Sequence, residues 1–157
     1  MKLFKTLKNQ KGFTLIELLV VIGILAVLLA ITLIAINPAR QFAQANNTKR
    51  RSDVNAILNA VNQYMADKKG DLPAGITSAI QSISNTGANI CSDIVPLYLA
   101  ALPTDPKVND GKSVTDCAAV EGYDTGYTIV KIAENNRITV AVAEANKELG
   151  EIISVTR

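Results

Sequence analysis

The chain contains no histidine and no tryptophan, and only two cysteines. Without histidine, neither a Ser-His nor a Cys-His nucleophilic couple can form. The two cysteines are not arranged as a CxxC pair, so their spacing does not indicate a zinc site. The acidic residues are scattered and form no convincing catalytic pair. We therefore predict that the chain is not an enzyme and needs no cofactor.

One segment resembles the end of a phosphate-binding loop, namely Gly111-Lys112-Ser113. In that motif the first glycine lies five positions before the second, and here that position is Pro106. The surrounding sequence also does not read as a strand followed by a helix. The pattern therefore does not predict a nucleotide site.

Acidic residues are absent from the first 12 positions, which contain Lys2, Lys5, Lys8 and Lys11. An excess of cations beside an apolar run is typical of the cytoplasmic side of a membrane. After position 12 the chain has 12 Lys and Arg against 14 Asp and Glu, a net charge of −2. This balance does not indicate a direct nucleic-acid site.

Charge is also nearly absent from residues 13–36, where Glu17 is the only ionisable side chain. As a helix this run would be about 36 Å long, enough to cross a hydrocarbon core of about 30 Å. A secretory signal has a shorter apolar region followed by a small-residue cleavage site, which is missing here. We predict a membrane anchor at 13–36 that is retained, and a globular domain outside the membrane at 37–157.

The junction Lys11-Gly12-Phe13-Thr14-Leu15-Ile16-Glu17 resembles the processing signal of type IV pilins and pseudopilins. The resemblance implies that residues 1–12 are a leader, that a prepilin peptidase cuts between Gly12 and Phe13, and that Phe13 is then N-methylated. It also implies that the pilus assembly machinery moves the subunit from the cytoplasmic membrane into an extracellular homopolymer. The alternative is a signal-anchor helix that is never cleaved.

The single charge of the apolar run, Glu17, needs a partner because an isolated carboxylate near hydrocarbon costs about 2.5–3.5 kcal/mol. Cleavage after Gly12 would create a cationic amino group on Phe13. When anchors stack side by side, Glu17 of one subunit can pair with that amine of a neighbour, and a polar pair of this kind sets the stagger. We predict that Glu17 is an assembly residue.

The segment that follows has a single apolar stripe at helical spacing. This pattern predicts an amphipathic helix over residues 38–69, continuous with the anchor apart from an interruption at Pro38. Lys68 and Lys69 favour the C-terminus of a helix, and Gly70 is expected at C′. The stripe consists of Val54, Ile57, Leu58, Val61, Tyr64 and Met65.

The second half of the chain favours strands. Residues 127–133 and 137–143 predict a hairpin, and residues 152–156 predict a third strand. Residues 71–90 are expected to form a loop, and a short helix is expected at 93–101 with Ser92 as its cap. We predict an α+β pilin fold, in which a long N-terminal helix packs on a small antiparallel sheet and Ile57, Leu58 and Val61 face strand residues 138–142.

Both cysteines, Cys91 and Cys117, lie in the part expected outside the membrane, where an oxidising environment favours a disulfide. Two free buried thiols are the alternative. Between the short helix expected at 93–101 and the hairpin is a loop whose aspartates could offer oxygen ligands to calcium, although their spacing matches no EF-hand, and a solvated acidic loop is the alternative. These candidates are Asp105, Asp110, Asp116 and Asp124.

Three functions are compatible with these patterns. The first is the structural subunit of a type IV pilus, which serves adhesion, motility or DNA uptake. The second is a pseudopilin or minor pilin, because Leu102-Pro103-Thr104-Asp105-Pro106 resembles a segment of the major pseudopilins of type II secretion, without the Trp-Gly that often follows there. The third is a membrane-anchored binding module that never polymerises.

Overall fold

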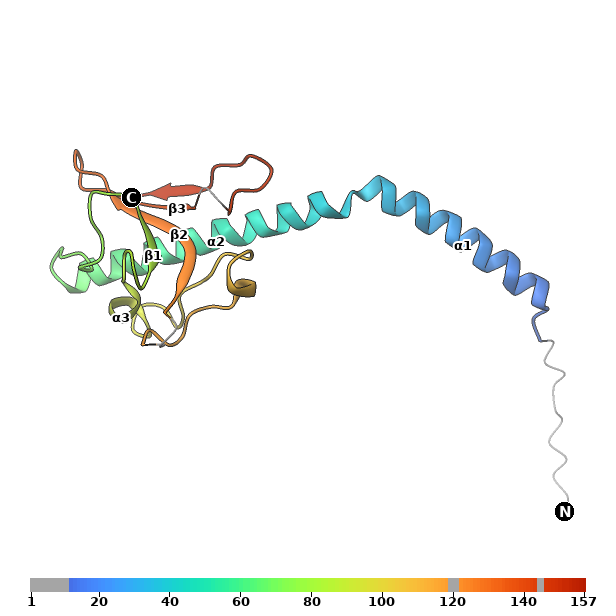
Figure 1. The fold of residues 1–157 in the computed structure, drawn as a ribbon, viewed down its shortest axis with the longest axis horizontal. Coiled ribbons are helices and arrows are strands. Elements are labelled where there is room, and N and C mark those ends of the chain that lie inside the picture. The colour runs from blue at the N-terminus through green and yellow to red at the C-terminus, as the bar shows by residue number, and fades with distance from the viewer. Residues whose placement is uncertain (1–11, 119–121, 144–145) are drawn as a thin grey trace, which may run out of the picture. The chain divides into compact units, whose positions relative to one another are not determined.

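The computed structural model describes residues 12–118, 122–143 and 146–157 (Figure 1). The chain divides into two compact units, residues 1–41 and residues 42–157. The helices are α1 (Leu15–Ile36), α2 (Pro38–Asp67) and α3 (Cys91–Ile94), with a 3-10 turn at Asn109–Gly111. The strands are β1 (Gln81–Ser84), β2 (Asp124–Lys131), β3 (Ile138–Val142) and β4 (Ser154–Thr156).

Helix α1 contains 22 residues, none of which is buried within the chain. An 18-residue stretch of it has a mean hydropathy of 3.2, so by length and composition the helix can cross a membrane. A helix that is apolar on all sides is unfavourable when its whole surface is exposed to water. Burial of α1 therefore has to come from lipid or from other molecules.

The helix predicted to run continuously from the anchor to residue 69 is interrupted at Asn37. This residue has a left-handed backbone (φ 48°, ψ 76°) and ends α1. Its side-chain oxygen accepts a hydrogen bond from the Arg40 amide at 3.3 Å, so it also caps the start of α2. Pro38 occupies the first position of α2, where its missing N–H leaves no unmade helical bond. The interruption expected at Pro38 thus lies at the residue before it.

The C-terminus of α2 corrects the prediction for Gly70. The residue in the C′ position is Lys69, with a left-handed φ of 57°. The Gly70 amide donates to the Met65 carbonyl at 2.8 Å, which is the longer bond of a Schellman motif and places Gly70 at C″. The glycine therefore sits one residue later than predicted.

The sheet has four antiparallel strands in the order β1-β2-β3-β4, one more than predicted. The predicted hairpin is confirmed by β2 and β3, in which Ile129 pairs with Val140, and by a turn whose Asn136 has φ 56°. The prediction of a loop over residues 71–90 is wrong for β1. This strand, Gln-Ser-Ile-Ser, has only one apolar residue, and it forms because β2 offers a free edge.

The prediction of a helix at 93–101 is also wrong in its extent, because α3 ends at Ile94 and its N-cap is Ile90 rather than Ser92. Val95 is extended (φ −98°, ψ 135°). The residue before a proline disfavours the α conformation because of the clash with the ring, so Pro96 ends the helix early.

The core lies between α2 and the sheet, which runs beside α2 in Figure 1. Val54, Ile57, Leu58 and Val61 of the predicted stripe are fully buried. They belong to one apolar cluster with the inward-facing residues of β3, as predicted. Burial of each such side chain stabilises the fold by about 1.5–3 kcal/mol. The β3 members are Ile138, Val140 and Val142.

Candidate functional site

The start of α1 is a capping box built by Thr14 and Glu17. The Glu17 amide donates to the Thr14 hydroxyl at 3.3 Å, and the Glu17 carboxylate accepts from the Thr14 amide at 2.9 Å and from its hydroxyl at 2.8 Å. Two amides that lack helical partners are thereby satisfied. The T-x-x-E pattern before an apolar run is the sequence signal for this cap.

Just before the cap, Gly12 and Phe13 lie outside the helix, and both are exposed. The Phe13 side chain is 83% exposed, and a Cβ added at Gly12 would meet nothing within 4 Å. Residues 1–11 of the predicted leader lie outside the described residues. The peptide bond between Gly12 and Phe13 is therefore in a non-helical segment that the fold does not cover.

Within the described part of the chain, Glu17 forms no ion pair. It belongs to the first turn of α1, where a carboxylate is favoured by the partial positive charge of the helix N-terminus. The cap orients the carboxylate toward the backbone of Thr14, one residue after Phe13. Glu17 and the backbone at Phe13 are thus held at the same end of the helix.

A second polar site was not predicted and lies inside the globular domain. Arg50 of α2 is fully buried and forms a two-pronged ion pair with Asp105, at 2.7 Å from Nε and 3.0 Å from Nη2. Its Nη1 donates to Glu148 at 2.6 Å and to Asn47 at 2.8 Å. Three chain segments far apart in sequence therefore meet at one guanidinium.

Close packing at this site requires a glycine in β2. Gly126 has φ 74°, and a Cβ there would lie 2.6 Å from Asn146 Nδ2, 2.7 Å from Val108 Cγ2 and 2.9 Å from the Asp105 Cβ. The Gly126 carbonyl accepts a hydrogen bond from Asn146 at 3.2 Å. The absence of a side chain thus lets the strand approach both loops that contribute acids to Arg50.

Hydrogen bonding and burial shift the pKa values of this network. The bond to Asp105 raises the pKa of Arg50. Burial opposes ionisation of Glu148, but hydrogen bonds from Asn46, Arg50 and Lys107 outweigh it and lower the Glu148 pKa. Burial, reinforced by a 2.7 Å hydrogen bond to Asp53, raises the pKa of Tyr127.

Because the pKa of Glu148 is lowered in the folded protein, we predict that the domain is less stable in acid. Because the folded-state pKa lies below the ordinary value of 4.5, the stabilisation is complete above that pH and is lost as the pH falls through the folded pKa. We expect the free energy of unfolding to decrease below about pH 4.5 and Glu148→Gln to flatten this decrease. Thermal unfolding at a series of pH values measures it, with the exposed Glu134→Gln as control. An unchanged slope in Glu148→Gln would contradict the assignment.

The calcium candidates do not converge. Both carboxylate oxygens of Asp105 are bound by Arg50, and Asp124 accepts hydrogen bonds from Ser82 and from the Gly126 amide. Asp116 accepts from the Ala118 amide at 2.9 Å. Across residues 12–118, 122–143 and 146–157, no group of three or more His, Cys, Asp or Glu side chains is placed to hold a metal ion. The structure thus gives Asp105 an ion-pair role.

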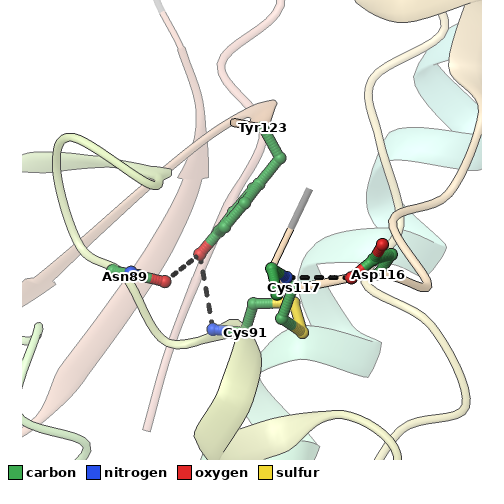
Figure 2. Close-up of a disulfide and its surroundings, with 6 residues drawn as sticks. Asn89, Cys91, Asp116, Cys117 and Tyr123 are labelled. Atoms are coloured by element: carbon green, nitrogen blue, oxygen red, sulfur yellow. Dashed lines mark hydrogen bonds between the residues drawn. A yellow bond between two sulfur atoms is a disulfide. The ribbon is translucent and has the colours of Figure 1, made fainter. Parts of the chain in front are cut away.

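The disulfide joins Cys91 and Cys117, whose Cα atoms are 5.4 Å apart (Figure 2). Cys91 is the first residue of α3 and is fully buried. Beside it the Tyr123 side chain points toward Asn89 and Cys91, and its hydroxyl donates to Asn89 at 2.9 Å and accepts from the Cys91 amide at 3.3 Å. The disulfide joins the start of α3 to the loop that precedes β2.

Removal of the disulfide should destabilise the domain without changing α1. The bond closes a loop with a sequence separation of 26 residues, for which chain entropy predicts a loss of about 3.5 kcal/mol. We expect this loss in the double variant Cys91→Ser and Cys117→Ser, measured by denaturant unfolding. Peptide mapping without reductant should recover the two cysteines as one linked peptide. Quantitative alkylation of both thiols in unfolded, unreduced protein would contradict it.

Comparisons with known proteins agree with the N-terminal geometry. Residues 7–33 match the family described as "Prokaryotic N-terminal methylation motif". The chain is also 33% identical over 89 residues to the type IV wide pilus major component PilA4 of Thermus thermophilus, an alignment covering 57% of this chain and 66% of the relative. No solved structure matches the chain significantly.

The methylation motif, the capped apolar helix and the small sheet domain together define the class of protein. It is an α+β protein with a long apolar N-terminal helix and a domain built on a small antiparallel sheet. The chain belongs to the type IV pilin and pseudopilin family.

Proposed function

We propose that the chain is the structural subunit of a type IV pilus. The observation that carries this proposal is α1, an apolar helix of 22 residues with no residue buried in its own chain and a single capped carboxylate at its start. This apolar surface is buried first in lipid and then against the same helix of neighbouring subunits. The relative from Thermus is named as the major component of a pilus, which supports this role.

The proposed precursor spans the cytoplasmic membrane once, with its N-terminus inside. The four lysines of residues 1–12 favour that orientation, and the disulfide favours an oxidising environment for the globular domain. A prepilin peptidase removes residues 1–12 and N-methylates Phe13. The assembly machinery then transfers α1 from the membrane into the fibre.

Processing is the first test. We expect the mature chain to begin at Phe13 and to carry one added methyl group, as measured by intact mass and N-terminal sequencing. Gly12→Val should block cleavage because a branched side chain would stand at the scissile bond, and it should not disturb the fold because nothing lies within 4 Å of that position. Cells without a functional prepilin peptidase serve as the control. Recovery of only the full-length chain from cells with an active peptidase would contradict the proposal and favour a membrane-anchored binding module that is not cleaved.

A pseudopilin or minor pilin is the second candidate, because residues 102–106 resemble a segment of the major pseudopilins. In this fold the segment contains Asp105, the ion-pair partner of the buried Arg50. This structural role would be the same in a pilus subunit and in a pseudopilin. Abundance separates the two functions. A pilus subunit should dominate fibres sheared from cells, whereas a pseudopilin should be scarce in them.

A further inference from the structure

The last segment of the chain, residues 146–157, is held to the globular domain mainly by polar contacts, and we call it the C-terminal strap. All of its residues are described by the structure, and among them only Ile153 is buried, at 5% exposure, while Val155 packs partly against the core. Its strand β4 pairs with β3 over three residues. Because apolar stabilisation scales with the area removed from water, burial contributes little to holding the strap.

Glu148 makes the strongest contact between the strap and the domain. Its carboxylate forms ion pairs with Arg50 of α2 at 2.6 Å and with Lys107 at 3.2 Å, and it accepts a hydrogen bond from Asn46 at 3.0 Å. The Glu148 side chain is 17% exposed, so water screens these ion pairs only in part. A protonated carboxyl group would lose the charge on which both ion pairs depend.

Glu151 makes the second charged contact of the strap, an ion pair with Arg51, and it accepts a hydrogen bond from Asn47 at 2.8 Å. Between the two glutamates, Leu149 has a left-handed backbone with a φ of 56°. Leucine is strained in this conformation because its Cβ approaches the carbonyl oxygen. Such strain persists only where the surrounding structure over-determines it. The strain at Leu149 therefore favours release of the strap once the glutamates lose their charge.

The rest of the domain keeps its charge balance without the strap. Arg50 has two contacts with Asp105, at 2.7 Å and 3.0 Å, and the side chains of both residues are fully buried. Arg50 also donates to Asn47 of the same helix at 2.8 Å. Loss of Glu148 would therefore leave the buried guanidinium with a carboxylate partner, which avoids the cost of an unpaired buried charge.

We propose that the C-terminal strap is an acid-sensitive device that opens as one unit while α2, the first three strands and the disulfide stay in place. Protonation of Glu148 and Glu151 removes the three ion pairs that hold the strap. The pKa of Glu148 is lowered from 4.5, so its contribution is complete above that pH and is lost as the pH falls through the folded-state pKa. Opening removes β4 from the sheet and leaves one edge of β3 without a partner.

Hydrogen exchange of the detergent-solubilised full chain tests this proposal, because it reports the opening of individual segments. The amides of Ile138, Val142 and Arg157 form hydrogen bonds between β3 and the strap. From pH 7 to about pH 3.5 their protection should fall about tenfold or more, after correction for the pH dependence of the chemical exchange rate. The amides of Leu102 and Asp105 bond elsewhere in the domain and should stay protected.

The double variant Glu148→Gln and Glu151→Gln should open the strap already at pH 7, because glutamine keeps the shape of glutamate but not its charge. The three strap amides should lose about tenfold in protection. Near-UV circular dichroism should stay that of the parent. Glu134→Gln is the matched control, since Glu134 is exposed in the turn between β2 and β3, and it should have no effect.

Two results would overturn the proposal. An equal loss of protection at the strap amides and at Leu102 and Asp105 would mean that the strap opens only when the whole domain unfolds. Unchanged protection of the strap amides, in acid or in the double variant, would mean that the charges of the two glutamates do not hold the strap.

Discussion

Asp105→Ala should destabilise the globular domain by about 3–5 kcal/mol, the cost of leaving one partner of a buried ion pair without the other. Arg50 and Asp105 both have fully buried side chains, so water cannot replace the lost carboxylate. Glu148 alone would remain to balance a guanidinium that makes two of its contacts to Asp105. Denaturant unfolding of the detergent-solubilised full chain, followed by near-UV circular dichroism, measures this loss.

Two variants show whether burial is the cause. Arg51→Met changes the neighbouring arginine, whose side chain is 52% exposed in its pair with Glu151, and should cost about 1 kcal/mol or less. The double variant Arg50→Met and Asp105→Leu removes the buried pair as a whole, and it should lose less stability than the two single changes added together. Additive losses in the double variant would mean that the two side chains act independently.

The second large effect concerns Glu17. We expect Glu17→Gln to be inserted and cleaved normally but to reduce fibre number about tenfold or more, because the subunit would lose the charge that we propose pairs with the Phe13 amine of a neighbour. Glutamine can still accept the Thr14 hydrogen bonds, so the helix cap is kept. Glu17→Ala removes both the charge and the cap and should assemble no better. Leader removal is measured by mass, and fibres are counted by electron microscopy.

Thr14→Ala separates the two roles of the carboxylate. It removes the capping hydroxyl at a cost of about 1 kcal/mol and leaves the Glu17 charge in place, so fibres should persist. Normal fibres from Glu17→Gln together with none from Glu17→Ala would show that the cap, and not the charge, supports assembly. A block in cleavage for all the Glu17 variants would instead mean that Glu17 is read by the peptidase.

The two long helices and the hairpin could be predicted from sequence because their signals are local. An apolar run with one carboxylate, a stripe at helical spacing and an alternating hairpin are each contained in one segment, and each favours one structure on its own. The family resemblance likewise depends on seven consecutive residues around Gly12 and Phe13. The α+β fold class and the helix that can span a membrane therefore followed directly.

The details that depend on neighbours could not be predicted. Strand β1 has a polar sequence, and its strand conformation comes from pairing with β2. Arg50 is the middle one of three consecutive cations, with Lys49 and Arg51 on either side, and nothing in the local sequence marks it as buried. Its partners Asp105 and Glu148 lie 55 and 98 residues away in sequence, and no periodic pattern connects them.

The sequence by itself determined the apolar helix α1, the amphipathic helix α2 and the hairpin of β2 and β3, because backbone preference and apolar periodicity act over a few residues. Only the tertiary structure decided that Arg50 is buried with two acids and that Leu149 is held in a left-handed turn. Both features depend on segments that are far apart in the sequence and meet only after folding. Contacts between these segments offset the free-energy cost of burying charges and of a left-handed backbone.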